Sequence, residues 1–265
     1  MNWTLYRREM KGSVKLLVIF GAIMTLYISI IITMYEPEMM ATLDSFYEVM
    51  PEMMAAVGMT AGATSLIGFM ISYLYGFILL IFPMVFCILR GHGLVARYVD
   101  RGSMTVLVAA PVKRTTIAFT QMGVLISGVL LLLAYDTALE YLVAQSAFPG
   151  ELELVQLLWL NLGLLCLHLC MGGICFLASC LFSETKYSMG VGAGLPALMY
   201  VLQMLANSGE DAKFAKYFTL FTLFDGNGIV AGEPCALTGV AVLLAGAVVL
   251  YAAGVLVFAN KDLHI

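Results

Sequence analysis

Long runs of apolar residues alternate with short polar stretches along the whole chain. The apolar runs cover residues 15–35, 65–89, 117–134, 154–182, 187–205 and 236–259. A helix needs about 20 apolar residues to cross the ~30 Å hydrocarbon core of a bilayer. The pattern therefore predicts an all-α, polytopic membrane protein in which a single transmembrane domain, residues 1–265, crosses the membrane as six helices.

The polar segment ahead of the first run, residues 1–14, is amphipathic. Trp3 and Tyr6 fall on one face of a helix, and Arg7 and Arg8 fall on the other. Such a face pair is typical of a helix that lies in the headgroup plane. We therefore expect an N-terminal elbow helix here, the alternative being a frayed basic tail.

Residues 36–60, between the first two runs, repeat apolar side chains at steps of three and four, which predicts a helical cap. Pro51 is expected to divide this cap into two pieces. Its stripe is rich in methionine, which fits packing against a neighbouring subunit or the bilayer, adaptable contact with cargo, or Cu(I) binding by thioethers. The side chains that carry the stripe are Met39, Met40, Phe46, Met50, Met53 and Met54.

Residues 207–235 form a second long connection that is half polar and half apolar. Its apolar centre is too short to span a bilayer. The segment therefore predicts a re-entrant or interfacial helix pair before the last span, turned at residues 225–228.

Composition supports a membrane protein, because 62% of the residues are hydrophobic and only 11% are charged. Ordinary soluble domains have about 45–50% and 25%. All but two of the 13 Lys and Arg residues, Lys213 and Lys216, lie at one side of the predicted spans. The positive-inside rule makes that side cytoplasmic, with both termini in the cytoplasm.

The 17 acidic residues show the opposite distribution. All except Glu9, Asp100, Glu184 and Asp262 are expected on the outer side. They form either a solvated rim or a vestibule that favours cationic cargo. Asp136 and Glu140 are expected at the outer end of the third span, in the interface.

Catalytic motifs are absent from the sequence. It contains no Gly-x-x-x-x-Gly-Lys-Ser/Thr phosphate loop, so the chain does not hydrolyse ATP by that route. His168 lies between Cys166 and Cys170, but on a helix it points away from them. We expect a buried histidine rather than a metal ligand, with no catalytic and no metal-binding residues.

The loop at residues 90–116 carries a recognisable order of residues. From Ala96 it reads "ARYVDRGSMTVLVAAPVKRTTIAFTQ". With the amphipathic N-terminus, the six spans and the ending "FANKDLHI", it resembles the ABC-2 type permease, the membrane subunit of type V ABC exporters. The family often has Glu before the Gly-Ser turn, where this chain has Asp100 and Arg101. The long outer segment 36–60 also resembles that of bacterial exporters of amphipathic peptides such as phenol-soluble modulins.

The resemblance implies that the loop couples the chain to two separate ABC ATPase subunits, which carry the ATP and Mg²⁺. The expected coupling residues are Arg97, Val99, Asp100, Arg101, Gly102, Ser103, Leu107, Pro111 and Arg114. It also implies a bacterial plasma membrane and a dimer with a second copy or a related permease.

The expected cargo is an apolar or amphipathic molecule, such as a cytolytic or antimicrobial peptide, and not nucleic acid. The aromatic residues of the second span are either cavity contacts or side chains that face the bilayer; they are Phe69, Tyr73, Tyr75 and Phe77. The alternatives are a permease of the same fold for copper or another small solute, and a membrane assembly subunit that transports nothing.

Overall fold

A computed structural model describes residues 1–60, 63–109 and 111–261, and this part of the chain is helical with no strand. Six of its helical stretches are long and apolar enough to cross a membrane. They are α1 (Trp3–Thr33), α5 with α6 (Ile78–Asp100), α8 (Arg114–Ala147), α9 (Leu154–Leu181), α10 (Thr185–Ser208) and α12 (Pro234–Asn260). The predicted all-α, polytopic membrane architecture is confirmed at this level.

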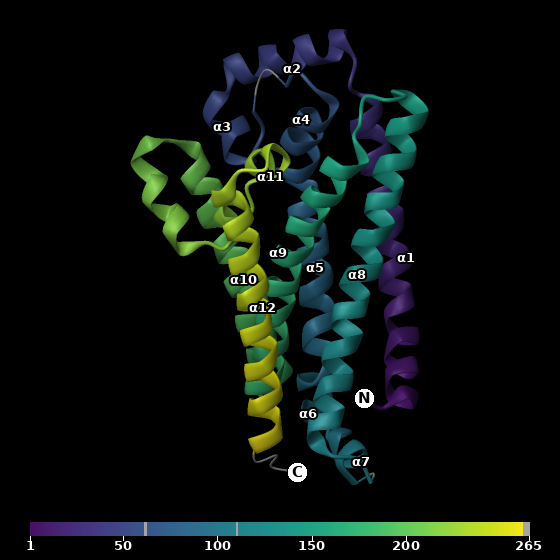
Figure 1. Cartoon of the computed structure of the whole chain (residues 1–265). Helices are drawn as coiled ribbons and strands as arrows, with labels where there is room; N and C mark the ends of the chain where they lie inside the picture. The colour runs from purple at the N-terminus through teal and green to yellow at the C-terminus, as the bar shows by residue number, and fades with distance from the viewer. Residues whose placement is uncertain (61–62, 110, 262–265) are drawn as a thin grey trace.

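The six long helices run side by side, and the shorter elements gather at the two ends of the bundle (Figure 1). At one end lie α6 (Ala96–Asp100), α7 (Met104–Ala109) and both chain termini. At the other end lie α2 (Pro37–Val49), α3 (Pro51–Ala56) and α11 (Gly226–Ala231). The 3₁₀ segments η2 (Glu210–Phe218) and η3 (Phe221–Leu223) belong to the same end.

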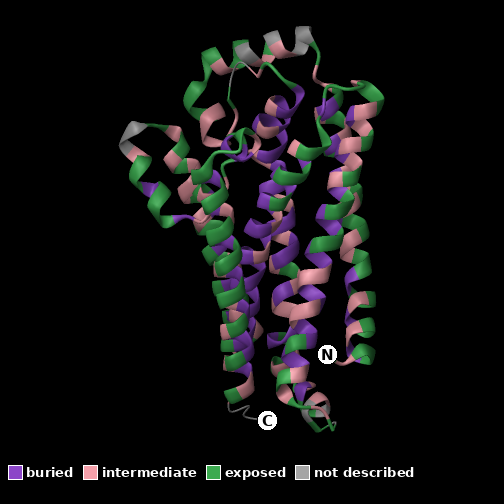
Figure 2. Ribbon diagram, viewed as in Figure 1, coloured by how far each residue is buried: buried purple, intermediate pink, exposed green. Residues whose placement is uncertain are grey.

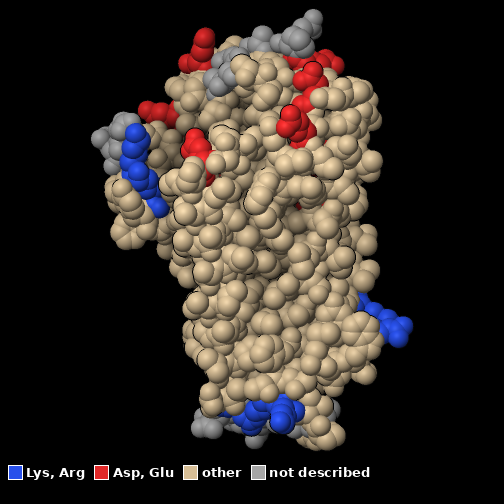
Figure 3. Space-filling model, viewed as in Figure 1, with Lys and Arg blue, Asp and Glu red and all other residues tan. Residues whose placement is uncertain are grey.

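Charge separates the two ends as the sequence predicts. Figure 3 shows acidic side chains around α2, α3 and α11, a basic group near α6 and α7, and a largely apolar belt between them. Further basic side chains lie beside the acidic group and at one flank of the belt. We call these the acidic end and the basic end. An apolar belt between two charged rims is the surface that a bilayer requires.

The core of the bundle is built around α9, which is the most buried of the six long helices. It packs against α5, α8, α10 and α12, and its buried side follows the centre of the molecule (Figure 2). By contrast, less than a third of α1, α10 and α12 is buried within the chain. Their outward side chains are aliphatic or aromatic, as in Val18, Leu198 and Val248.

The N-terminal segment differs from the expected elbow. Residues 3–14 are the first turns of α1, and the helix continues without a break to Thr33. No proline interrupts residues 3–33, and the first turns pack on the bundle through Leu5, Glu9 and Ser13. At about 1.5 Å per residue, α1 is also longer than the hydrocarbon core is thick.

The third predicted span is far longer than its apolar run. We expected residues 117–134, but α8 extends to Ala147 and ends just before Pro149 and Gly150. The polar residues after position 134 do not stop the helix, because only the Pro-Gly pair breaks the backbone pattern. The extra turns carry Asp136 and Glu140, which are both fully buried rather than solvated in an outer rim.

The second predicted span is interrupted. It begins as α4 (Leu66–Met70), continues as a π-helical segment η1 (Ile71–Tyr75), breaks at Gly76 and Phe77, and resumes as α5 (Ile78–Leu94). The loop after α3 fills this break. The Thr60 and Ser72 hydroxyls are 2.6 Å apart, and a Cβ on Gly76 would lie 2.9 Å from the Gly58 carbonyl oxygen.

Pro51 divides the segment before this span as expected, since α2 ends at Val49 and α3 begins at Pro51. In the 207–235 segment the outcome differs from the predicted turn. Asp225 instead caps α11, its carboxylate accepting a hydrogen bond from the Gly228 N–H at 3.0 Å. Aspartate is a strong N-cap residue, so the same Asp-Gly-Asn-Gly sequence starts a helix here.

Candidate functional site

The predicted coupling loop folds as a helix–turn–helix at the basic end. α6 ends at Asp100, and α7 starts at Met104. Gly102 adopts φ +66°, a left-handed conformation that glycine adopts without strain, and its N–H donates to the Val99 carbonyl at 2.9 Å. The turn is exposed to solvent at Asp100, Arg101 and Gly102.

The nine predicted coupling residues fall into two groups. Arg97, Asp100, Arg101, Gly102 and Pro111 are exposed, whereas Val99, Ser103, Leu107 and Arg114 are partly buried. Val99 and Leu107 attach the loop to the bundle by packing against its hydrophobic core. The Ser103 hydroxyl instead donates within the loop, to the Tyr98 carbonyl at 3.3 Å.

An ion pair anchors α6 to α1 and α5. Arg90 of α5 donates to a carboxylate oxygen of Glu9 at 2.8 Å and to the Glu9 backbone carbonyl at 2.8 Å. The Tyr98 hydroxyl of α6 donates to the other Glu9 carboxylate oxygen. Glu9 and Arg90 are only 7% and 11% exposed. We call these three side chains the Glu9 anchor.

A second contact anchors α6 to α9. The Ala96 N–H donates to the Ser179 hydroxyl at 2.9 Å, and this hydroxyl donates to the His92 carbonyl at 3.3 Å. The chain kinks at Val95, between α5 and α6, with φ −127° and ψ −61°. The exposed turn is therefore connected to α1, α5 and α9 within one helical turn.

Arg114 joins the ends of three helices rather than facing solvent. Its guanidinium donates to the Lys261 carbonyl at 3.0 Å, and the Lys261 ammonium donates to the Cys180 and Leu181 carbonyls at 3.2 and 2.9 Å. Those carbonyls end α9, where a cation is favoured by the helix dipole. The resemblance at the C-terminal tail also includes residues 262–265, which lie outside the described residues.

The expected elbow residues do not form one interface. Trp3, Arg7 and Arg8 are exposed. Tyr6 is partly buried, and its hydroxyl donates to the Ser127 hydroxyl of α8 at 2.8 Å. The sequence-based assignment of faces missed Glu9, which shares the buried face of Leu5 and Ser13 at steps of four.

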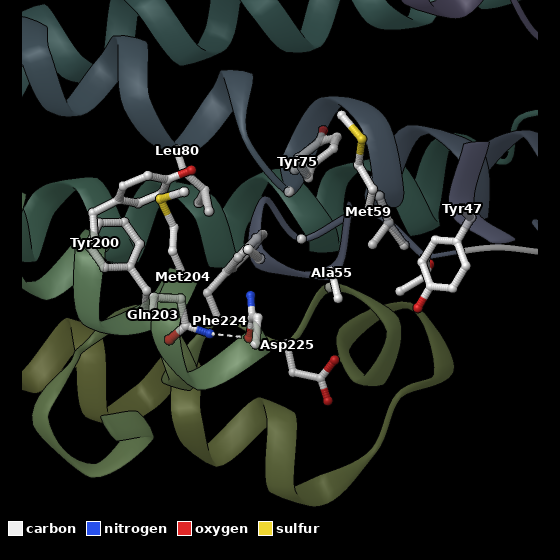
Figure 4. Close-up of a pocket in the computed structure, with 18 residues that line it drawn as sticks. Tyr47, Ala55, Met59, Tyr75, Leu80, Tyr200, Gln203, Met204, Phe224 and Asp225 are labelled. Atoms are coloured by element: carbon white, nitrogen blue, oxygen red, sulfur yellow. Dashed lines mark hydrogen bonds between the residues drawn. The ribbon is translucent and has the colours of Figure 1, made fainter. Parts of the chain in front are cut away.

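A cavity of about 360 Å³ opens at the acidic end, where the break in the second span meets α10 and η3. Figure 4 shows aromatic, methionine and amide side chains around it. Gln203 donates to Asn207 at 3.1 Å and accepts from Thr222 at 2.8 Å. Side chains that line the cavity include Tyr47, Met59, Tyr75, Tyr200, Gln203, Met204, Asn207, Phe224 and Asp225.

Only one of the four predicted cavity aromatics lines this cavity, namely Tyr75. Phe69 and Tyr73 are buried against each other, with ring centroids 4.6 Å apart. Phe77 is partly buried and meets the Tyr200 ring edge-on at 6.4 Å. The alternative that Phe69, Tyr73 and Tyr75 face the bilayer does not hold, because all three side chains are buried within a single chain, with at most 8% exposed.

The methionine stripe is also displaced from the cavity. Phe46, Met50 and Met53 are exposed, and Met40 and Met54 are partly buried; the side chain of Met39 lies outside the described part. The cap instead lines the cavity with Tyr47, Ala55 and Met59, which are neighbours of the predicted set.

A buried polar cluster lies behind Tyr75. The Tyr75 hydroxyl donates to a Glu140 carboxylate oxygen at 2.7 Å, and the Asn161 amide donates to the same oxygen at 2.9 Å. Asp136, one turn before Glu140 on α8, is fully buried. These four residues come from η1, α8 and α9, and the sequence analysis assigned none of the polar contacts among them.

His168 is fully buried in α9, and its Nε2 lies 2.8 Å from the Leu79 carbonyl of α5. This is the buried histidine that we expected. Among the residues that the structure describes, no three His, Cys, Asp or Glu side chains are grouped to hold a metal ion.

The site therefore has two parts: an exposed, anchored turn at the basic end and a mixed polar and aromatic cavity at the acidic end. Neither the known protein families nor the curated proteins show a significant match to this chain.

Proposed function

We propose that this chain is the membrane subunit of an ABC exporter, and that separate ATPase subunits bind the α6–α7 turn. The observation that carries the proposal is an exposed, charged turn with rigid connections to three long helices. Arg97, Asp100 and Arg101 present both signs of charge on its surface. Complementary charges on a partner would fix the register of such a contact.

The anchors provide the mechanical connection that coupling requires. A force on α6 reaches α1 and α5 through the Glu9 anchor and α9 through Ser179. Buried, hydrogen-bonded contacts transmit displacement because packed interiors are stiff. ATP-driven movement of the partner would in this way move half of the bundle.

A second copy of the chain, or a related permease, completes the proposed transporter. The centre of the bundle is occupied by α9, the most buried of the long helices, so we place the export path between two copies rather than within one. α1 and α10 expose apolar faces that another subunit or lipid can cover. In this arrangement the basic end faces the bacterial cytoplasm and the acidic end faces outward.

The acidic-end cavity supports an apolar or amphipathic cargo. Its aromatic and methionine side chains contact apolar groups, and Gln203, Asn207 and Asp225 offer polar contacts beside them. Methionine side chains adapt to varied apolar partners. An amphipathic peptide presents both kinds of surface.

The test is reconstitution with a candidate phosphate-loop ATPase, sought first in the reading frames next to the gene for this chain. Asp100→Ala with Arg101→Ala should weaken ATPase association and reduce the stimulation of ATP hydrolysis by the permease, by about tenfold if the two contacts contribute about 1.4 kcal/mol. Glu151→Ala with Lys216→Ala, which removes one charge of each sign from exposed positions outside the turn, is the matched control and should leave both unchanged.

Unchanged association and stimulation in the double variant would refute the assignment of the turn. Failure of the wild-type chain to bind the ATPase or change its turnover would refute the exporter proposal as a whole.

A further inference from the structure

The polar cluster behind Tyr75 contains an excess of acceptor atoms. Four of its buried oxygens receive no hydrogen bond from any described residue: both carboxylate oxygens of Asp136, Oε1 of Glu140 and Oδ1 of Asn161. All four atoms are acceptors, so what the cluster lacks is hydrogen-bond donors or positive charge. Buried polar atoms are normally paired, and exceptions call for a ligand or a functional role.

No described side chain supplies the missing charge. The carboxyl groups of Asp136 and Glu140, both on α8, lie close enough to interact electrostatically with each other and with Tyr75 of η1. From α9, the neutral Asn161 completes the group. His168 lies two turns further along α9, with one ring nitrogen at the Leu79 carbonyl.

The buried side chains of the neighbouring helix α1 are apolar at this level. Over residues 20–32, the buried side chains of α1 are Phe20, Met24, Ile28 and Ile32. Within the described part of the chain, the ion pair is Glu9–Arg90 at the opposite end. An isolated ionised carboxylate in a low-dielectric interior is very unfavourable, so the neutralising charge must come from solution.

The donor set indicates what kind of cation fits. Carboxylate, amide and phenol oxygens are hard ligands that suit H⁺, alkali-metal and alkaline-earth cations. A Ca²⁺ cage uses six to eight oxygen ligands. The cluster has two carboxylates, and no group of three metal-ligating side chains occurs in the described chain. The Tyr75 and Asn161 donors already stabilise charge on Glu140, which leaves Asp136 as the carboxylate without a partner. One uncompensated charge and a ligand count short of a Ca²⁺ cage favour a monovalent cation.

An entry route from the acidic end reaches the cluster at Tyr75. This side chain lines the 360 Å³ cavity and also donates to Glu140. It belongs to the π-helical segment η1, a rare backbone form that is frequent at functional sites. The acidic side chains at this end of the bundle (Figure 3) raise the local concentration of cations.

We propose that Asp136, Glu140, Tyr75 and Asn161 form a binding site for a small monovalent cation, Na⁺ or H⁺, that enters from the cavity at the acidic end. The proposal goes beyond the exporter function and does not depend on it, because the site lies within one chain. Its test needs neither an ATPase nor cargo.

The experiment uses the full-length chain purified into lipid nanodiscs. Equilibrium binding of ²²Na⁺ is measured in N-methylglucamine buffer at mildly alkaline and mildly acidic pH. In parallel, infrared spectroscopy follows the carbonyl band of protonated carboxyl groups across the same pH range. Asp136→Asn and Glu140→Gln keep the side-chain shape and remove one charge each. Glu48→Gln, at an exposed position of α2, is the matched control.

With Na⁺ as the ligand, wild type and Glu48→Gln bind ²²Na⁺ saturably. Each cluster variant weakens this binding about tenfold or more, which is the usual cost of removing a group that surrounds a bound metal ion. With H⁺ as the ligand, ²²Na⁺ does not bind saturably, but a protonated-carboxyl band fades as the pH rises and Asp136→Asn removes it.

Two results would overturn the proposal. One is the absence of both saturable ²²Na⁺ binding and a titrating carboxyl band in wild type. The other is binding and titration that persist unchanged in both cluster variants. Helicity and a monodisperse elution profile confirm that each variant is folded. If one of the two cluster variants does not fold, the other still tests the proposal.

Discussion

Removal of the Glu9 side chain should be strongly destabilising, because it leaves a buried guanidinium without its counter-charge. Breaking a buried ion pair by removing one partner costs about 3–5 kcal/mol. In Glu9→Ala, Arg90 keeps its 2.8 Å hydrogen bond to the backbone carbonyl of residue 9, which favours the low end of that range. Loss of the acceptor for Tyr98 adds about 1 kcal/mol. We therefore expect a loss of about 3–4 kcal/mol for Glu9→Ala.

The assay is unfolding of the chain in mixed micelles by a denaturing detergent, followed by circular dichroism. Arg7→Ala and Lys11→Ala are matched controls, since both side chains are exposed on α1, and each should change the unfolding free energy by less than about 0.5 kcal/mol. Arg90→Met should be less damaging in the Glu9→Ala background than alone, because it then removes an unpaired charge.

Two results would refute this reasoning. The first is a Glu9→Ala protein whose unfolding free energy lies within about 0.5 kcal/mol of wild type. The second is additivity of Glu9→Ala and Arg90→Met, which would mean that the two side chains do not stabilise each other.

Two further stability predictions use the same assay. In Gly91→Ala the new Cβ would lie 2.6 Å from Cβ of Cys175, so we expect a loss of about 1–3 kcal/mol. Gly93→Ala meets nothing within 4 Å and should be neutral or stabilising by up to about 1 kcal/mol, and equal effects would contradict the close α5–α9 packing. Lys261→Met removes the donor to the Cys180 and Leu181 carbonyls and should cost about 1 kcal/mol. The exposed Lys113→Met serves as control, and a cost no larger than that of the control would show that the Lys261 contact contributes nothing.

The spans were predictable because hydropathy alone decides whether a helix can cross a bilayer. Where a helix ends is a different question, and α8 illustrates it. The apolar run stops near residue 134, but the backbone meets no breaker until Pro149. The same reasoning explains α1, in which a change from basic to apolar side chains at residue 15 leaves the helix unbroken.

The two parts of the site differ in how far the sequence could reveal them. The turn at Gly102 has a local signal, since Asp-Arg-Gly-Ser follows a basic helix and precedes an apolar one. Glu9 had a weaker signal, its position four residues from Leu5 and from Ser13 on the buried face. The sequence also does not single out Arg90 as the partner of Glu9, because any of several arginines could pair with it.

The cluster around Glu140 has almost no local signal. Tyr75 and Asn161 are 86 positions apart and meet only because η1 and α9 pack together. The two hints are the polar Asn161 within an apolar run and the acidic pair Asp136 and Glu140 at a step of four. Both are consistent with an interfacial helix end, and only tertiary packing distinguishes a buried pair from a solvated one.

The contact between α9 and α12 determines which helices can move. The Tyr251 hydroxyl of α12 is seated over Gly172 of α9, where a Cβ would lie 2.6 Å from it, and Phe176 of α9 is seated over Gly254 of α12, at 2.7 Å. Because each helix inserts an aromatic ring into a notch of the other, axial sliding of one past the other meets a steric stop in both directions. The pair must therefore move as one rigid body, so a force that reaches α9 through Ser179 also displaces α12.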